Sequence, residues 1–139
     1  MTEQKPASLW WIAFFVSVSV SILTTIIIIA LVFLVGMVSP DFYIDQWAMT
    51  TTGLIVMNIL TFVVMWISIM HQARYASKRY LITDYRKAVL YTTIGFVLLT
   101  ILGFVLDFWQ GYELFWEDYA LAVLGIVIAY IATRQYLRP

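Results

Sequence analysis

The chain reads LWWIAFFVSVSVSILTTIIIIALVFLVGMV from Leu9 to Val38, a stretch without one charged side chain. A transmembrane helix needs about 20 predominantly apolar residues to cross a hydrocarbon core of about 30 Å. This run is longer than that, so the helix that it forms either tilts or projects beyond the membrane. The apolar core of a cleaved signal peptide has only about 7–15 residues. We therefore expect the run to be retained as the first membrane helix.

Three further apolar runs follow in a chain that is 63% hydrophobic and only 12% charged. The pattern predicts an all-α, polytopic membrane protein with one membrane domain and four transmembrane helices, arranged as two antiparallel hairpins. The expected helices cover residues 9–38, 47–71, 87–107 and 114–136. An inner basic loop is expected at 72–87, and an outer loop of aromatic and acidic residues at 107–118.

The charges are segregated along this pattern. All eight Lys and Arg residues fall in the N-terminal leader, the 72–87 loop and the C-terminal tail. Six of the eight acidic residues fall in the other two connections. Because loops rich in Lys and Arg stay in the cytoplasm, we predict a multi-pass protein of the cytoplasmic (inner) membrane with both termini inside.

Several kinds of chemistry are disfavoured by what the sequence lacks. With no cysteine, thiol catalysis, iron–sulfur clusters and thiolate metal sites are excluded. No charged residue is expected near the centre of a span, where pumps and ion-coupled carriers usually place one. The basic residues are explained by topology and by anionic lipid headgroups, so nucleic acid is not expected as a partner. We predict no enzyme activity, no cofactor and no bound metal.

Two polar features lie inside the expected spans. Ser17, Ser21 and Thr25 recur every four residues on the first helix, a spacing that lets helices approach closely. Asn58 is the most polar side chain at mid-depth, and its amide needs a hydrogen-bonding partner in lipid. We expect that partner on a neighbouring helix, from Thr24, Thr25, Thr93 or Tyr130, or on another subunit. Alternatively, Ser17, Ser21, Thr25 and Asn58 line a pathway through an oligomer.

The 107–118 connection is the most aromatic part of the chain. Trp109, Tyr112, Phe115 and Trp116 recur at helical spacings, with acidic residues between them. This pattern predicts an amphipathic interfacial helix or an outward extension of the fourth helix. The aromatic residues are candidates for a partner interface, with anchoring at the lipid surface as the alternative.

The only histidine, His71, precedes Thr83, Asp84 and Tyr85. These residues resemble the histidine and downstream Asp-Tyr pair of the membrane anchor subunits of succinate dehydrogenase, which implies a haem or quinone anchor. The spacing differs, and the chain has a fourth span, so this is the third of three hypotheses. The first is an accessory, assembly or scaffolding subunit of a larger membrane complex or homo-oligomer, in contact with the lipid bilayer. The second is a small oligomeric transporter or channel.

Overall fold

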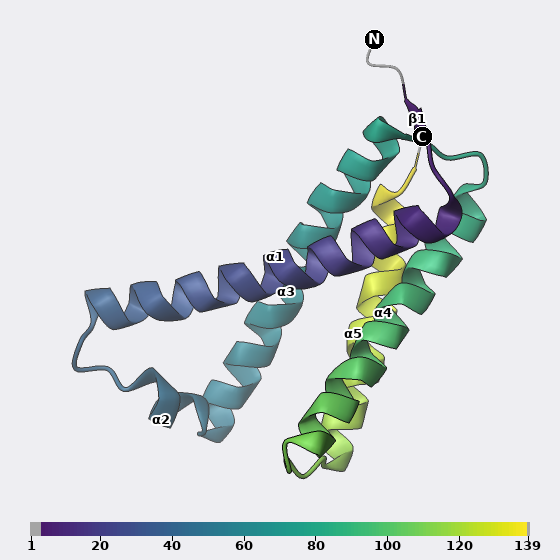
Figure 1. Ribbon diagram of the computed structural model, residues 1–139. Coiled ribbons are helices and arrows are strands. Elements are labelled where there is room, and N and C mark those ends of the chain that lie inside the picture. The colour runs from purple at the N-terminus through teal and green to yellow at the C-terminus, as the bar shows by residue number, and fades with distance from the viewer. Residues whose placement is uncertain (1–3, 139) are drawn as a thin grey trace.

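The computed structural model of the protein describes residues 4–138, and most of them are helical (Figure 1). The helices are α1 (Leu9–Val38), α2 (Ile44–Ala48), α3 (Thr51–Arg79), α4 (Tyr85–Trp109) and α5 (Trp116–Tyr136). Two short strands, β1 (Lys5–Pro6) and β2 (Tyr80–Leu81), pair in parallel. Four of the helices, α1, α3, α4 and α5, are long and apolar enough to cross a membrane. The all-α class and the four apolar helices expected from the sequence are confirmed.

Three of the long helices begin at a side chain that accepts a hydrogen bond from a backbone N–H of the first turn. Ser8 accepts from Trp11, Thr50 from Gly53, and Asp84 from Lys87. Such caps satisfy backbone donors that have no partner within the helix, and each adds about 1 kcal/mol of helix stability where the residue is ordered. At the start of α4 this cap is supplied by Asp84.

The second span begins later than the sequence prediction of residue 47. Trp47 belongs to the separate short helix α2, and α3 begins at Thr51. The chain turns so tightly between the two helices that a β-carbon on Gly53 would lie 2.0 Å from the carbonyl oxygen of Trp47. Only glycine fits that approach, and the Thr50 cap starts the new helix there.

The second span also ends later than predicted, which corrects most of the expected inner loop at 72–87. α3 continues to Arg79, and α4 already begins at Tyr85. The helix continues through this basic segment because Ala73, Ala76 and Ser77 are buried along one face of it. Its basic residues lie on the exposed side of the helix. The polar composition that predicted a loop is therefore that of an exposed helix face.

The expected helix through the outer aromatic segment is also wrong. α4 ends at Trp109, α5 begins at Trp116, and residues 110–115 form a turn. Gly111 has a positive φ of 83°, which ends α4 because side chains rarely adopt this conformation. The backbone N–H of Phe115 donates to the Asp118 carboxylate at 2.8 Å, where α5 starts. The remaining helix bounds differ from the predicted ones by two residues at most.

The core lies near one end of the bundle, which we call the core end. In α1 the buried residues all fall between Ile12 and Val20, and the rest of the helix diverges from α4 and α5 (Figure 1). β1 and the end of α5 both lie at the core end (Figure 1). There, β1 pairs with β2, and Leu137, just after α5, is only 1% exposed. The opposite end, with α2 and the 110–115 turn, is the open end.

Polar and aromatic contacts join α3 to α5 at the core end. The indole N–H of Trp66 donates to the hydroxyl of Tyr136 at 3.2 Å, and the two rings meet edge to face. The Arg74 guanidinium lies 5.0 Å from the centre of the Tyr136 ring. Tyr136 thus contacts α3 through both its hydroxyl and its ring face.

Candidate functional site

The serine and threonine stripe of α1 runs from the core outward. Ser17 is buried, Ser21 is half-buried and Thr25 is exposed. Each hydroxyl donates to the backbone carbonyl four residues earlier, at 2.7, 2.9 and 2.9 Å in turn. Ser17 also faces α4, where a β-carbon on Gly95 would lie 2.7 Å from its Oγ. At Ser17 the stripe therefore brings two helices close together, and its hydroxyls are already bonded within α1.

Within the described chain, Asn58 makes no hydrogen bond to Thr24, Thr25, Thr93 or Tyr130, the partners expected on neighbouring helices. Its Nδ2 donates to the carbonyl of Leu54, one turn earlier on α3, at 2.8 Å. Because α3 begins at Thr51, Asn58 lies about 10 Å from the start of the helix, at 1.5 Å per residue. It is therefore nearer the open end than predicted. In the part of the chain that the structure describes, no second hydrogen bond reaches this amide.

The four aromatic candidates of the outer segment are all strongly exposed at the open end. Trp109 is 83% exposed, Tyr112 64%, Phe115 59% and Trp116 74%. They come from the end of α4, the turn and the start of α5, rather than from one helical face. The turn nevertheless keeps them close in sequence and leaves a large aromatic surface uncovered within the described chain.

His71 lies exposed on α3. Over residues 4–138, no group of three or more His, Cys, Asp or Glu side chains is arranged to hold a metal ion. The histidine and the Asp-Tyr pair lie on different elements, since Asp84 caps α4 and Tyr85 begins it.

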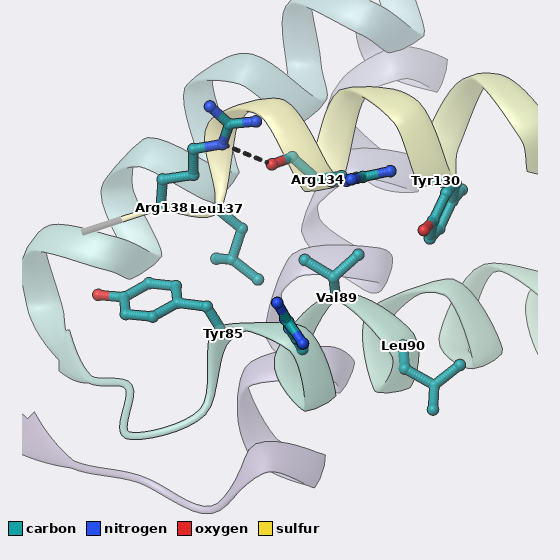
Figure 2. A pocket seen from close by; sticks show the side chains of 8 residues that line it. Tyr85, Val89, Leu90, Tyr130, Arg134, Leu137 and Arg138 are labelled. Carbon is teal, nitrogen blue, oxygen red and sulfur yellow. Dashed lines mark hydrogen bonds between the residues drawn. The ribbon is translucent and has the colours of Figure 1, made fainter.

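A cavity of about 440 Å³ lies between α4 and α5 at the core end (Figure 2). We call it the arginine cavity because three arginines line it. One side comes from the first two turns of α4 and the other from the last two turns of α5 and the residues after it. Leu137 and Val89 lie between the two helices and are buried, at 1% and 7% exposed (Figure 2). The lining residues are Tyr85, Arg86, Val89, Leu90, Tyr130, Arg134, Leu137 and Arg138.

The arginine cavity has an excess of positive charge. Arg86, Arg134 and Arg138 line it together with no acidic residue. Among the residues that the structure describes, the single ion pair joins Lys87 to Asp84 at 3.6 Å, outside the lining. The Nε of Arg138 donates to the carbonyl of Arg134 at 3.0 Å (Figure 2). That bond holds the Arg138 side chain along α5 and leaves its terminal nitrogens free of any described partner.

The Asp84 carboxylate is the nearest acidic group in sequence, and it is already engaged. The backbone N–H of Lys87 donates to it at 3.0 Å, and the Lys87 ammonium lies near it. These contacts, the backbone hydrogen bond first, hold the pKa of Asp84 below its usual value. Asp84 therefore stays ionised at neutral pH, and its carboxylate caps the start of α4.

Nothing in the sequence predicted this cavity. The sequence pattern explained the basic residues by topology and by attraction to anionic lipid headgroups, without bringing any of them together. Tyr130 and Arg134 are four residues apart, which places them on one face of α5, and Arg138 follows four residues later, just beyond the helix. Arg86 of α4 lines the same cavity because of how the two helices pack. Sequence spacing does not predict this.

No protein-family model, curated protein or solved structure matches the chain, so its function has to be argued from its own residues.

Proposed function

We propose that this protein is a small, non-catalytic membrane subunit that works through helix contacts with other membrane subunits or with further copies of itself. Its role would be accessory, assembly or scaffolding. The single observation that carries the proposal is the amide of Asn58. A side-chain amide offers two donor hydrogens and a carbonyl oxygen, and here only one donor has a described partner.

An amide without partners is costly in lipid, where no water can replace the missing bonds. Asn58 lies on an apolar stretch of α3 between Met57 and Ile59. Beyond Val20, α1 has no buried residue and diverges from α4 and α5. A helix of another chain has access to this region and would supply the missing hydrogen bonds, as polar side chains do between membrane helices.

The experiment compares Asn58→Leu with Thr61→Val in lipid nanodiscs. Thr61 is a matched control because it lies on the same helix and its hydroxyl is already bonded to the carbonyl of Met57 at 2.8 Å. Asn58→Leu should weaken association by about 0.5–2 kcal/mol, the range of such bonds in membranes, and Thr61→Val should not. Native mass spectrometry would count copies and partners. An unchanged distribution for Asn58→Leu would remove the basis of the proposal.

The alternative is a small oligomeric transporter with Ser17, Ser21, Thr25 and Asn58 along its path. The burial of Ser17 against Gly95 supports a packing role for the start of the stripe instead. The two functions separate in liposomes that contain the purified chain alone. Solute flux through them would favour the transporter, whereas a subunit that acts through contacts produces none.

We further propose that the core end faces the cytoplasm. Lys5 in β1, Arg79 beside β2 and Arg138 near the C-terminus all belong to segments that meet at this end. The chain has no cysteine of its own, so single cysteines can be labelled cleanly. Thr83→Cys should be protected from an impermeant reagent in intact cells, and Gln110→Cys should be labelled. The reverse pattern would invert the topology.

A further inference from the structure

We propose that the arginine cavity binds the phosphate headgroup of an anionic phospholipid. The inference is independent of any protein partner. It rests on the charge of the cavity, on the order of polar and apolar residues along it, and on the helix end that it includes.

The charge comes from Arg86 on one side and from Arg134 and Arg138 on the other. Guanidinium groups present several N–H donors in a plane and bind phosphate oxygens in pairs, which is why arginine is favoured at phosphate sites. All three arginines are exposed on the described chain, and none has a carboxylate partner among the residues that the structure describes. A ligand with a negative charge would meet no competing acidic group in the lining.

The start of α4 adds to this potential. Tyr85 and Arg86 occupy the first turn of a helix of 25 residues, whose N-terminal end carries a partial positive charge. Asp84 caps this end and offsets part of its charge, since its carboxylate accepts a hydrogen bond from the Lys87 N–H and pairs with the Lys87 side chain. The helix end alone would not make a site, but here it adds to three arginine side chains.

The order of residues along both helices matches an amphiphile. On α4, Arg86 is followed one turn deeper by Val89 and Leu90. On α5, Arg134 is preceded one turn deeper by Tyr130, and Arg138 follows just beyond the end of the helix. Leu90 is 53% exposed and Tyr130 39% exposed, so an acyl chain can lie against both. A free phosphate would use only the charged end, whereas a phospholipid would use the whole length of the cavity.

Binding of short-chain lipids to the full chain in mild detergent, followed by native mass spectrometry, tests the proposal. The probes are short-chain phosphatidylglycerol, phosphatidylcholine with the same chains, and glycerol phosphate. We expect phosphatidylglycerol to bind at least about fivefold more tightly than phosphatidylcholine, since each arginine near an anionic group is worth about a fivefold change in affinity. It should also bind more tightly than glycerol phosphate, which has no acyl chains to place against Leu90 and Tyr130. Phosphatidylcholine binding as tightly would overturn the role of the charge. Glycerol phosphate binding as tightly would overturn the lipid assignment.

Variants locate the site. Arg86→Gln and Arg134→Gln should each weaken phosphatidylglycerol binding about fivefold, and Arg86→Lys should retain most of it. The matched controls are Lys78→Gln and Arg79→Gln, which remove exposed basic residues from the last turn of α3, outside the cavity. An equal loss in these controls would mean that the lipid responds to diffuse surface charge, which contradicts a built site. Leu90→Ser should weaken the binding of phosphatidylglycerol and leave the binding of glycerol phosphate unchanged.

Discussion

Gly95 of α4 and Ser17 of α1 are in such close contact that a β-carbon on the glycine would lie 2.7 Å from the serine Oγ and 3.1 Å from its Cβ. Ser17 is 2% exposed, and its hydroxyl is bonded to the carbonyl of Ala13. The hydroxyl therefore cannot move aside without losing its hydrogen bond. This contact sets how closely α1 approaches α4. Both helices contribute buried residues to the core.

The contact predicts that Gly95→Ala is destabilising. The added methyl group overlaps Ser17 and should lower the free energy of unfolding by about 1–3 kcal/mol, the usual cost of overpacking. Gly103→Ala is the matched control, because it lies on the same helix and a β-carbon there would meet nothing within 4 Å. Reversible unfolding in mixed detergent micelles measures both. Combining Gly95→Ala with Ser17→Ala should recover part of the loss, and an additive loss would contradict the contact.

The Tyr136 hydroxyl predicts a second, smaller effect. Tyr136→Phe removes the acceptor of the Trp66 indole N–H and should lower the free energy of unfolding by about 0.5–1.5 kcal/mol. Tyr112→Phe removes a hydroxyl from a side chain that is 64% exposed and should change nothing measurable. Reversible unfolding of both variants in the same lipid or detergent measures the difference. Equal stability of the two variants would show that water replaces the bond.

The Asp84 cap predicts a pH dependence of stability. The pKa of Asp84 is lowered in the folded protein, chiefly by the Lys87 N–H, so folding favours its ionised form. Its contribution is complete above the unfolded pKa of about 4 and is lost as the pH falls through the lower, folded value. Asp84→Ala should therefore lower the unfolding temperature at neutral pH, and the gap to the unaltered chain should narrow in acid.

Asp84→Asn separates the cap from the charge. Asparagine caps helices as well as aspartate does but does not titrate in this range. We expect it to keep most of the stability at pH 7 and to lose the acid-dependent part. If the Asn and Ala variants were equally unstable, the ionic contact with Lys87 would outweigh the hydrogen bond to its N–H.

The aromatic surface at the open end predicts a test of partner docking. Trp109 and Trp116 are 83% and 74% exposed, and buried aromatic residues dominate protein interfaces. If they contact a partner, replacing both with Ala should weaken co-purification about tenfold or more without affecting membrane insertion. Tyr43→Ala, at an exposed tyrosine in the other connection of the open end, is the control. Retained partners with only a shifted tryptophan emission would falsify docking and leave an anchor in the lipid interface.

The long apolar helices were predictable because they depend on local properties of the chain. A long apolar run is helical in a membrane, since every backbone group must be bonded within its own segment. The first apolar run was predicted to be helical over residues 9–38, as in the structure. The prediction failed at Trp47 and between 72 and 79, where the course of the chain depends on close contacts with another turn or another helix.

By itself, the sequence determined the number of long apolar helices, the segregation of charge and the polar positions within the spans, because hydropathy and spacing are written along one segment at a time. Only the tertiary structure decided which of those positions meet. It set Ser17 against Gly95, left Asn58 bonded to its own helix, and brought Arg86 into one cavity with Arg134. The reason is physical: the crossing of two helices is set by the shapes of side chains on both, and neither helix carries that information alone.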